Sequence, residues 1–309
     1  MPSNEPRITV EAALRDLTSP KATTRADAAW DLDGAALTDA SLVLALRGAL
    51  GDPSPEVRRA AAFALAGAAD APTCEALSLA ATADPDGEVR QAAVVALGRL
   101  GSEGGVAAVR RALADPDPDV RFQATAVVVA LDPANAAPAL APLLEDADAE
   151  VRGSAVAALG DLRAREHSDL LRARLRDVDE GVQFEAAVAL ARLDDASGVE
   201  VLLAHLRRRD TRLLAAEHLF LVAGPEHLAP LLQHARAARF DPLLRVWLAG
   251  AAARLGDAAS QQELLAALDR RNPLVHGVAV RVVEAIDAPW ARQRAASLGG
   301  PERALRSGE

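Results

Sequence analysis

The feature that most constrains how this chain can fold is a repeat of about 31 residues. Each copy opens on an aliphatic anchor that begins an apolar run, and the first clear anchors, 32, 31, 31 and 31 residues apart, are Val57, Val89, Val120, Val151 and Val182. The same step leads on to Leu213, Leu244 and Val275, and TRADAAWDLDG at 24–34 aligns with VRRAAAFALAG at 57–67. A period of this length is typical of stacked repeat units. The sequence therefore predicts nine copies, of which the first is degenerate.

Each copy carries the signature of a capped helix. Three residues before the anchor stands a residue that favours a helix N-cap: Ser54, Asp86, Asp117, Asp148, Asp179, Asp210, Asp241 and Asn272. In four copies a proline follows, at the position where a helix tolerates it best. Apolar residues then recur at helical spacing, and a second apolar segment separates one copy from the next. Each unit is therefore predicted to be two antiparallel helices joined by an Asp-Pro-type turn.

The recurring pattern D-P-x-x-E-V-R-x-x-A-x-x-A-L-G-x-L-G resembles the HEAT-like repeats of the phycobilisome-lyase type. It is closest in the segments 52–68, 84–101, 115–132, 146–163 and 177–193. The resemblance implies an all-α fold, a right-handed α-solenoid (α-α superhelix) of about nine HEAT-like helix pairs plus a C-terminal closing helix. It also implies that the second helix of each pair lines a concave face, and that the protein holds other proteins. Lyase chemistry does not follow from the fold.

The phase of the repeat runs through the chain without a linker. We expect one continuous solenoid over residues 1–300, with a degenerate first repeat at 8–38, consensus repeats at 39–195, divergent repeats at 196–287 and a closing helix at 288–300. The last segment, 301–309, is expected to be a flexible tail.

Composition narrows the class further. The 309 residues carry a formal net charge of −10 and a single cysteine, Cys74, which excludes an intramolecular disulfide and suits a reducing compartment. The chain shows no secretory signal and no apolar stretch of membrane length, so we expect a cytoplasmic protein with no membrane segment. Because Lys21 is the only lysine in an acidic chain, nucleic acid is a disfavoured partner.

Side chains two, three and six residues after the anchor vary between copies, so stacking alone does not explain them. The concave-face candidates for partner binding are Arg59, Phe63, Gln91, Val95, Phe122, Gln123, Phe184, Glu185, Val188, Leu219, Val246 and Trp247. We interpret them as an apolar strip that grips a partner segment, anchored by Phe122 and Phe184. In the alternative the rings fold back onto neighbouring repeats, and full burial of both phenylalanines would exclude the strip.

A second candidate surface is basic. Near the ends of the first helices of the C-terminal copies the chain carries Arg172, Arg174, Arg176, Arg207, Arg208, Arg209 and Arg239. Stacked copies would align these side chains along one edge that could bind an anion or a partner. The interpretation that the sequence favours is simpler: cations at helix C-termini, paired with Asp177, Asp179 and Asp210.

The sequence offers no catalytic constellation. Deoxyhypusine hydroxylase uses a similar solenoid to hold two irons through His-Glu pairs two and three residues after the anchor, where this chain has pairs such as Arg59-Ala60 and Gln91-Ala92. No GxSxG, P-loop, GxGxxG or HExxH motif occurs, and we expect no metal and no cofactor.

The function that this sequence predicts is a non-enzymatic scaffold or adaptor that binds another protein through the concave face. A bilin lyase or chaperone that handles a tetrapyrrole and its acceptor protein stays open as an alternative. A weaker alternative is an anion or nucleic-acid binder that uses the arginine edge. A monomer is compatible with the sequence, and the oligomeric state stays open.

Overall fold

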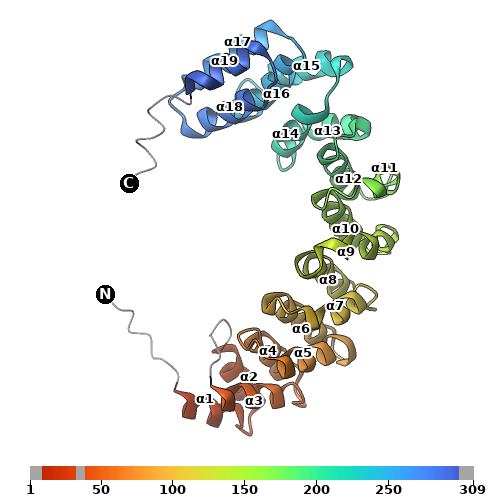
Figure 1. The fold of residues 1–309 in the computed structure, drawn as a ribbon, viewed down its shortest axis with the longest axis vertical. Helices are drawn as coiled ribbons and strands as arrows, with labels where there is room; N and C mark the ends of the chain where they lie inside the picture. The colour runs from red at the N-terminus through yellow and green to blue at the C-terminus, as the bar shows by residue number, and fades with distance from the viewer. Residues whose placement is uncertain (1–8, 33–38, 299–309) are drawn as a thin grey trace. The chain divides into compact units, whose positions relative to one another are not determined.

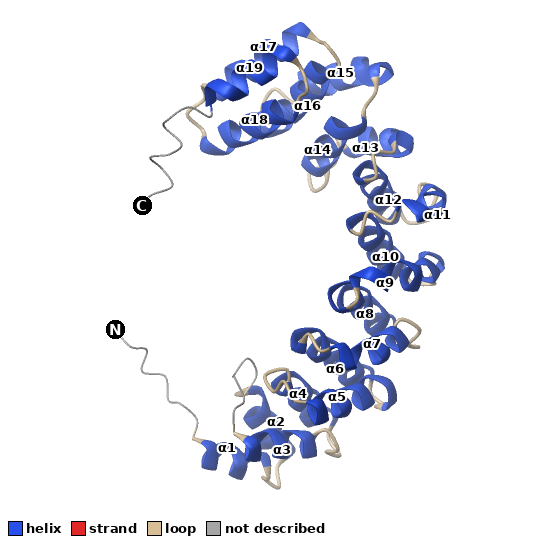
Figure 2. Ribbon diagram, viewed as in Figure 1, coloured by secondary structure: helices blue, strands red, loops and turns tan. Residues whose placement is uncertain are grey.

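The computed structural model describes residues 9–32 and 39–298. These residues form nineteen α-helices and five short 3-10 helices, with no strand among them (Figures 1 and 2). The fold class predicted from the sequence, an α-solenoid, is confirmed. The predicted flexible tail at 301–309 and the end of the predicted closing helix lie outside the described residues.

Contacts divide the chain into two compact units, the N-terminal unit (residues 1–162) and the C-terminal unit (residues 163–309). The N-terminal unit contains α1 (Val10–Leu17), α2 (Ala22–Trp30), α3 (Ala40–Ala49), α4 (Pro55–Leu65), α5 (Ala71–Ala83), α6 (Gly87–Leu100), α7 (Val106–Ala112), α8 (Pro118–Leu131), α9 (Pro133–Leu140) and α10 (Ala149–Asp161). The C-terminal unit contains α11 (Ser168–Arg174), α12 (Glu180–Arg192), α13 (Val199–His205), α14 (Arg212–Val222), α15 (Leu228–Ala237), α16 (Pro242–Arg254), α17 (Ala258–Leu268), α18 (Pro273–Ala285) and α19 (Pro289–Leu298). The organisation as one continuous domain stays a prediction.

Within each unit the helices form two layers. In the N-terminal unit the second helices α2, α4, α6, α8 and α10 pack in sequence against one another, and the first helices α1, α3, α5 and α7 do the same (Figure 1). In the C-terminal unit α12, α14, α16 and α18 form the layer of second helices. The helices pair as α1–α2 through α17–α18, which gives the nine predicted copies within the described residues, and α19 packs on α18 as the closing helix.

The predicted caps explain where the second helices begin. At the start of α6 the carboxylate of Asp86 accepts hydrogen bonds from the backbone N–H groups of Glu88 and Val89. At the start of α10 the carboxylate of Asp148 accepts the equivalent bonds from Glu150 and Val151. Two of the predicted caps differ. Ser54 makes no side-chain bond at the start of α4, and α14 is preceded by Thr211 in place of Asp210.

The core lies between the two layers of each unit. Leucines eight residues after the anchor, such as Leu65, Leu97 and Leu159, are completely buried. Each buried leucine stabilises the unit by roughly 1.5–3 kcal/mol relative to an exposed one. Cys74 is buried as well, as expected for a core thiol.

A ladder of arginine–aspartate pairs joins successive copies of the N-terminal unit. The arginine that follows each anchor meets the aspartate five residues before the next anchor, and the rungs of this ladder are Arg25–Asp52, Arg58–Asp84, Arg90–Asp115 and Arg121–Asp146. In each rung the arginine donates two hydrogen bonds of 2.7–2.9 Å to the carboxylate. A third nitrogen bonds a backbone carbonyl, as Arg90 does with Asp84 at 2.9 Å. Because Arg25 donates to its carboxylate, the pKa of Asp52 lies below its ordinary value.

The ladder changes in the C-terminal unit. After Val182 the arginine is replaced by Gln183, whose amide donates to the carbonyl of Asp177 at 2.7 Å. The column of aspartates then gives way to Arg208, Arg239 and Arg270. The ladder therefore does not run through the copies of the C-terminal unit, which share a continuous apolar core.

Two histidines belong to that apolar core. His205 stacks on Phe184 with ring centroids 4.3 Å apart, and His218 lies buried with its Nδ1 2.8 Å from the carbonyl oxygen of Leu214. Burial lowers the pKa of both imidazoles below the ordinary value for histidine.

This lowered pKa predicts a loss of stability in acid. An unfolded histidine binds a proton below about pH 6.5, whereas the folded chain resists it, so each such group lowers the unfolding free energy by at most about 1.4 kcal/mol per pH unit in that range. Above pH 7 this contribution is constant. We expect the urea midpoint to fall between pH 7.5 and pH 5, and to fall less in the variant His218→Leu. An equal fall in both proteins would contradict the assignment to His218.

Candidate functional site

The second helices of the N-terminal unit carry the clearest candidate surface. Six of the predicted partner-binding residues lie on α4, α6 and α8, and all six keep contact with solvent: Arg59, Phe63, Gln91, Val95, Phe122 and Gln123. Phe122 is 42% exposed and so belongs to the exposed large apolar side chains of the chain. The structure thus leaves this part of the predicted strip available to a partner.

An aromatic stack stands at one end of this surface. Trp30, the last residue of α2, stacks on Phe63 of α4 with ring centroids 5.3 Å apart and planes inclined by 29°. Trp30 remains 38% exposed and Phe63 is half-buried, so the stack is not part of the core. Aromatic rings in this geometry attract one another beyond the effect of the area they bury, and this attraction holds Trp30 and Phe63 in place relative to each other.

Two arginines complete the surface. The guanidinium of Arg59 lies 5.8 Å from the ring centre of Trp30, and that of Arg99 lies 5.5 Å from the ring centre of Phe63. Arg59 also pairs with Glu88 of α6. We call the four residues Trp30, Arg59, Phe63 and Arg99 the aromatic–arginine patch. Cation–π contacts of this kind hold the guanidinium groups over the rings.

Phe122 lies further along the same layer, on α8. The carbonyl of Phe122 accepts a hydrogen bond of 2.6 Å from the hydroxyl of Thr125, and that hydroxyl lies 2.5 Å from the hydroxyl of Ser154 on α10. These contacts fix the backbone below the ring and leave the ring itself to solvent. Phe122 is therefore a second apolar contact point on the layer.

In the C-terminal unit the predicted strip is wrong. Five of its members are core residues at 0–9% exposure: Phe184, Val188, Leu219, Val246 and Trp247. Phe184 is covered because it stacks on His205, and Trp247 because it packs at 5.8 Å against Phe220. Only Glu185 among the predicted residues here keeps partial exposure. For these five side chains the alternative, in which they fold back onto neighbouring repeats, is the correct one.

Several arginines of the predicted edge form ion pairs with nearby acidic side chains. Arg172 bonds Asp169 and Asp195 at 2.5 Å, Arg174 lies 3.7 Å from Asp177, and Arg208 pairs with Glu180. Arg239 lies over the ring of Phe240 at 4.6 Å. The remaining predicted members of the edge, Arg176, Arg207 and Arg209, are exposed. The pairing that the sequence favoured is thus present, although with different acids from those expected except at Asp177.

Family models match the repeats directly. The model for HEAT repeats matches residues 74–159 and 137–220, and the model for a single HEAT repeat matches residues 42–70. The chain belongs to the HEAT-repeat family. Together the matched segments include α4 and α6 to α13 in full and α5 from Cys74 onward, and they contain every ladder rung from Arg58 to Asp146.

Two solved structures share the fold of this chain, and a third gives a lower TM-score. The X-ray structure of YibA of Escherichia coli is 19% identical to this HEAT-repeat chain over 80% of it and 93% of YibA, with a TM-score of 0.65. An engineered protein is 24% identical over 94% of this chain and 92% of its own, with a TM-score of 0.55. The complex of CpcE and CpcF of phycocyanin lyase from Nostoc sp. is 22% identical over 93% and 97%, with a TM-score of 0.43. No curated protein matches the chain.

The HEAT-repeat array places two residues in the patch that the sequence analysis did not select. Trp30 occupies the same column of the repeat as Phe63, and this shared column is the sequence feature that indicates that the two rings meet. Arg99 had no such signal, because its column differs from copy to copy. Its place over Phe63 depends on how closely α4 and α6 approach.

Two further properties of the described part of this HEAT-repeat protein bear on function. No three His, Cys, Asp or Glu side chains gather there in a group that could hold a metal ion. Nor does any of its helices have the length and apolarity needed to cross a membrane.

Proposed function

We propose that this HEAT-repeat protein is a non-enzymatic scaffold that binds another protein through the second-helix layer of its N-terminal unit. The observation that carries the proposal is the aromatic–arginine patch, in which Trp30 and Phe63 stack in contact with solvent between two arginines. Tryptophan and arginine are the residues most enriched among those that dominate the free energy of protein association.

The chemistry of the patch indicates what it binds. The exposed faces of Trp30 and Phe63 favour an aliphatic or aromatic side chain, and Arg59 and Arg99 favour a carboxylate beside it. Phe122 supplies a further apolar contact on the same layer. A partner segment with apolar residues and an acid between them is the best match. According to the family resemblance, this layer is the concave face.

The test uses a photo-crosslinking amino acid in the full chain. We expect p-benzoylphenylalanine placed at position 63 or 122 to crosslink a protein from native lysate that the same residue at position 79 does not. Leu79, on α5 in the first-helix layer, is 67% exposed and is the matched control. Equal crosslinking from positions 63 and 79 would count against the patch.

Affinity for the crosslinked protein then measures the patch directly. Replacing a residue that dominates an interface costs about 2 kcal/mol, so the Kd of Trp30→Ala is expected to rise about 30-fold. The variant Leu79→Ala is expected to bind as the original chain does. Circular dichroism of each variant checks that the helices are retained. An unchanged Kd for folded Trp30→Ala would refute the proposal.

A further inference from the structure

The strongest unassigned feature lies between α16, α17 and α18, where the ladder reverses its charge. Arg245 follows the anchor Leu244 and so occupies the ladder's arginine column. The aspartate column of the next copy, five residues before Val275, holds Arg270. An arginine therefore stands where every rung of the N-terminal unit has a carboxylate.

The copy with the reversed charge also contains a hydrogen-bond donor without an acceptor. In all four rungs of the ladder the arginine Nε donates to an aspartate oxygen at 2.7–2.8 Å. The Nε of Arg245 is buried and has no hydrogen-bond partner, although another nitrogen of the same guanidinium pairs with Glu263. A buried N–H without an acceptor destabilises the fold unless a bound group supplies one.

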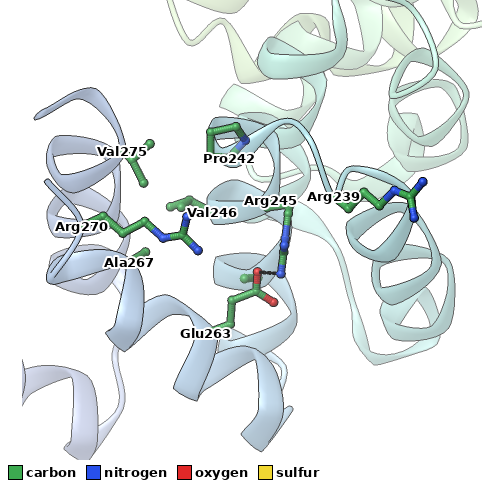
Figure 3. A pocket seen from close by; sticks show the side chains of 9 residues that line it. Arg239, Pro242, Arg245, Val246, Glu263, Ala267, Arg270 and Val275 are labelled. Carbon is green, nitrogen blue, oxygen red and sulfur yellow. Dashed lines mark ion pairs between the residues drawn. The ribbon is translucent and has the colours of Figure 1, made fainter. Parts of the chain in front are cut away.

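A cavity adjoins these side chains. Its volume is about 40 Å³, and Arg245, Arg270, Glu263, Val246, Ala267 and Val275 line it. In Figure 3 Arg270 extends into this space toward Val246, and Arg245 extends toward Glu263. Arg239 lies at the rim with its guanidinium turned away. Since one water needs roughly 10–15 Å³ by this measure, the cavity holds about three non-hydrogen atoms, the size of a carboxylate.

The net charge of the cavity also favours a carboxylate. Two arginines and one glutamate give the cavity a net charge of +1. Arg270 makes no ion pair with any part of the chain that the structure describes, while Arg245 already shares Glu263. Arginine forks match the planar geometry of a carboxylate, as the four rungs of the ladder show in this chain itself.

We infer that this cavity binds a carboxylate from another molecule, which takes the place that the ladder aspartate holds in the N-terminal copies. The inference goes beyond the proposed function: it concerns another unit and other residues, and it stands if the aromatic–arginine patch binds nothing. The carboxylate can belong to an acidic side chain or to the C-terminus of a peptide.

The test follows the Nε–Hε NMR signal of Arg245 in the full chain, assigned through its loss in Arg245→Met. The probes are acetyl-Gly-Gly-Glu-Gly-amide, which has only a side-chain carboxylate, and acetyl-Gly-Gly-Gly-Gly with a free C-terminus. Acetyl-Gly-Gly-Gln-Gly-amide, which has no carboxylate, is the blank, and inorganic phosphate is a fourth probe. We expect a saturable shift with one or both carboxylate peptides and none with the blank, and the peptide that shifts the signal identifies the source of the group.

The variant Arg270→Asp gives a second, independent measurement, because it restores the ladder carboxylate. It is expected to abolish the peptide-induced shift. It is also expected to raise Tm by about 2–4 °C, which corresponds to a gain of about 1 kcal/mol in a domain the size of the C-terminal unit. Arg271→Asp makes the same change of charge one residue outside the column and is expected to keep the peptide response. No shift with either carboxylate peptide, a shift with phosphate alone, or equal loss of response in both variants would overturn the inference.

Discussion

Replacing Arg90 by alanine is expected to lower the free energy of unfolding by about 2–3 kcal/mol, because the change leaves Asp115 with a carboxylate that is out of water and has lost its counter-charge. The side chains of Arg90 and Asp115 are only 11% and 7% exposed. The same change removes the bond from Arg90 to the carbonyl of Asp84, which ties the turn before α6 to the helix itself. Urea unfolding followed by circular dichroism measures the effect.

Two variants separate the role of the rung from a general loss of charge. Arg90→Gln keeps a donor for the carbonyl, as Gln183 does naturally at the same column, so it is expected to lose less stability than Arg90→Ala. Arg165 forms an ion pair with Asp194 in which both side chains are more than half exposed, and Arg165→Ala is expected to change stability little. If Arg90→Ala were no more harmful than Arg165→Ala, the ladder would not stabilise the array.

The elements of this fold could be predicted because their signals are local. An aspartate three residues before an aliphatic anchor caps the helix in most copies, as Asp86, Asp148 and Asp241 do, and Asp210 is the exception. The ladder was not recognised, although both of its columns are visible in the repeat. Its aspartate stands two residues before the cap, inside the predicted Asp-Pro-type turn. Only the approach of neighbouring copies shows that it meets the arginine after the preceding anchor.

The candidate site was harder to predict because burial depends on what the neighbouring helix offers. Phe122 and Phe184 occupy the same column two copies apart, yet one is exposed and the other buried. Phe184 meets the flat ring of His205, and two copies earlier the position of His205 is held by Leu143, which has no ring to stack on. No property of the phenylalanines themselves distinguishes them. The sequence therefore places both phenylalanines on second helices but could not predict which of them is exposed.

The variant Gly198→Ala is expected to lower the free energy of unfolding, because the two helix layers approach closely at this glycine. A β-carbon at this position would lie 2.6 Å from the Cα and 2.7 Å from the Cβ of Ala187 on α12, closer than atoms of this kind can come. Since a backbone atom cannot turn aside as a flexible side chain can, the segment before α13 must move away from α12. Overpacking of this kind costs about 1–3 kcal/mol.

The repeat shows why this glycine is not a general requirement. At the same column two copies earlier stands Ala136, which is completely buried, so that copy of the array accepts a β-carbon. Gly277 on α18 is the matched control, because a β-carbon there meets nothing within 4 Å. Gly277→Ala is expected to stabilise by about 0.5–1 kcal/mol through helix propensity alone. Urea midpoints that move in opposite directions would support the close contact at Gly198, and two that both rise would show that α13 shifts without cost.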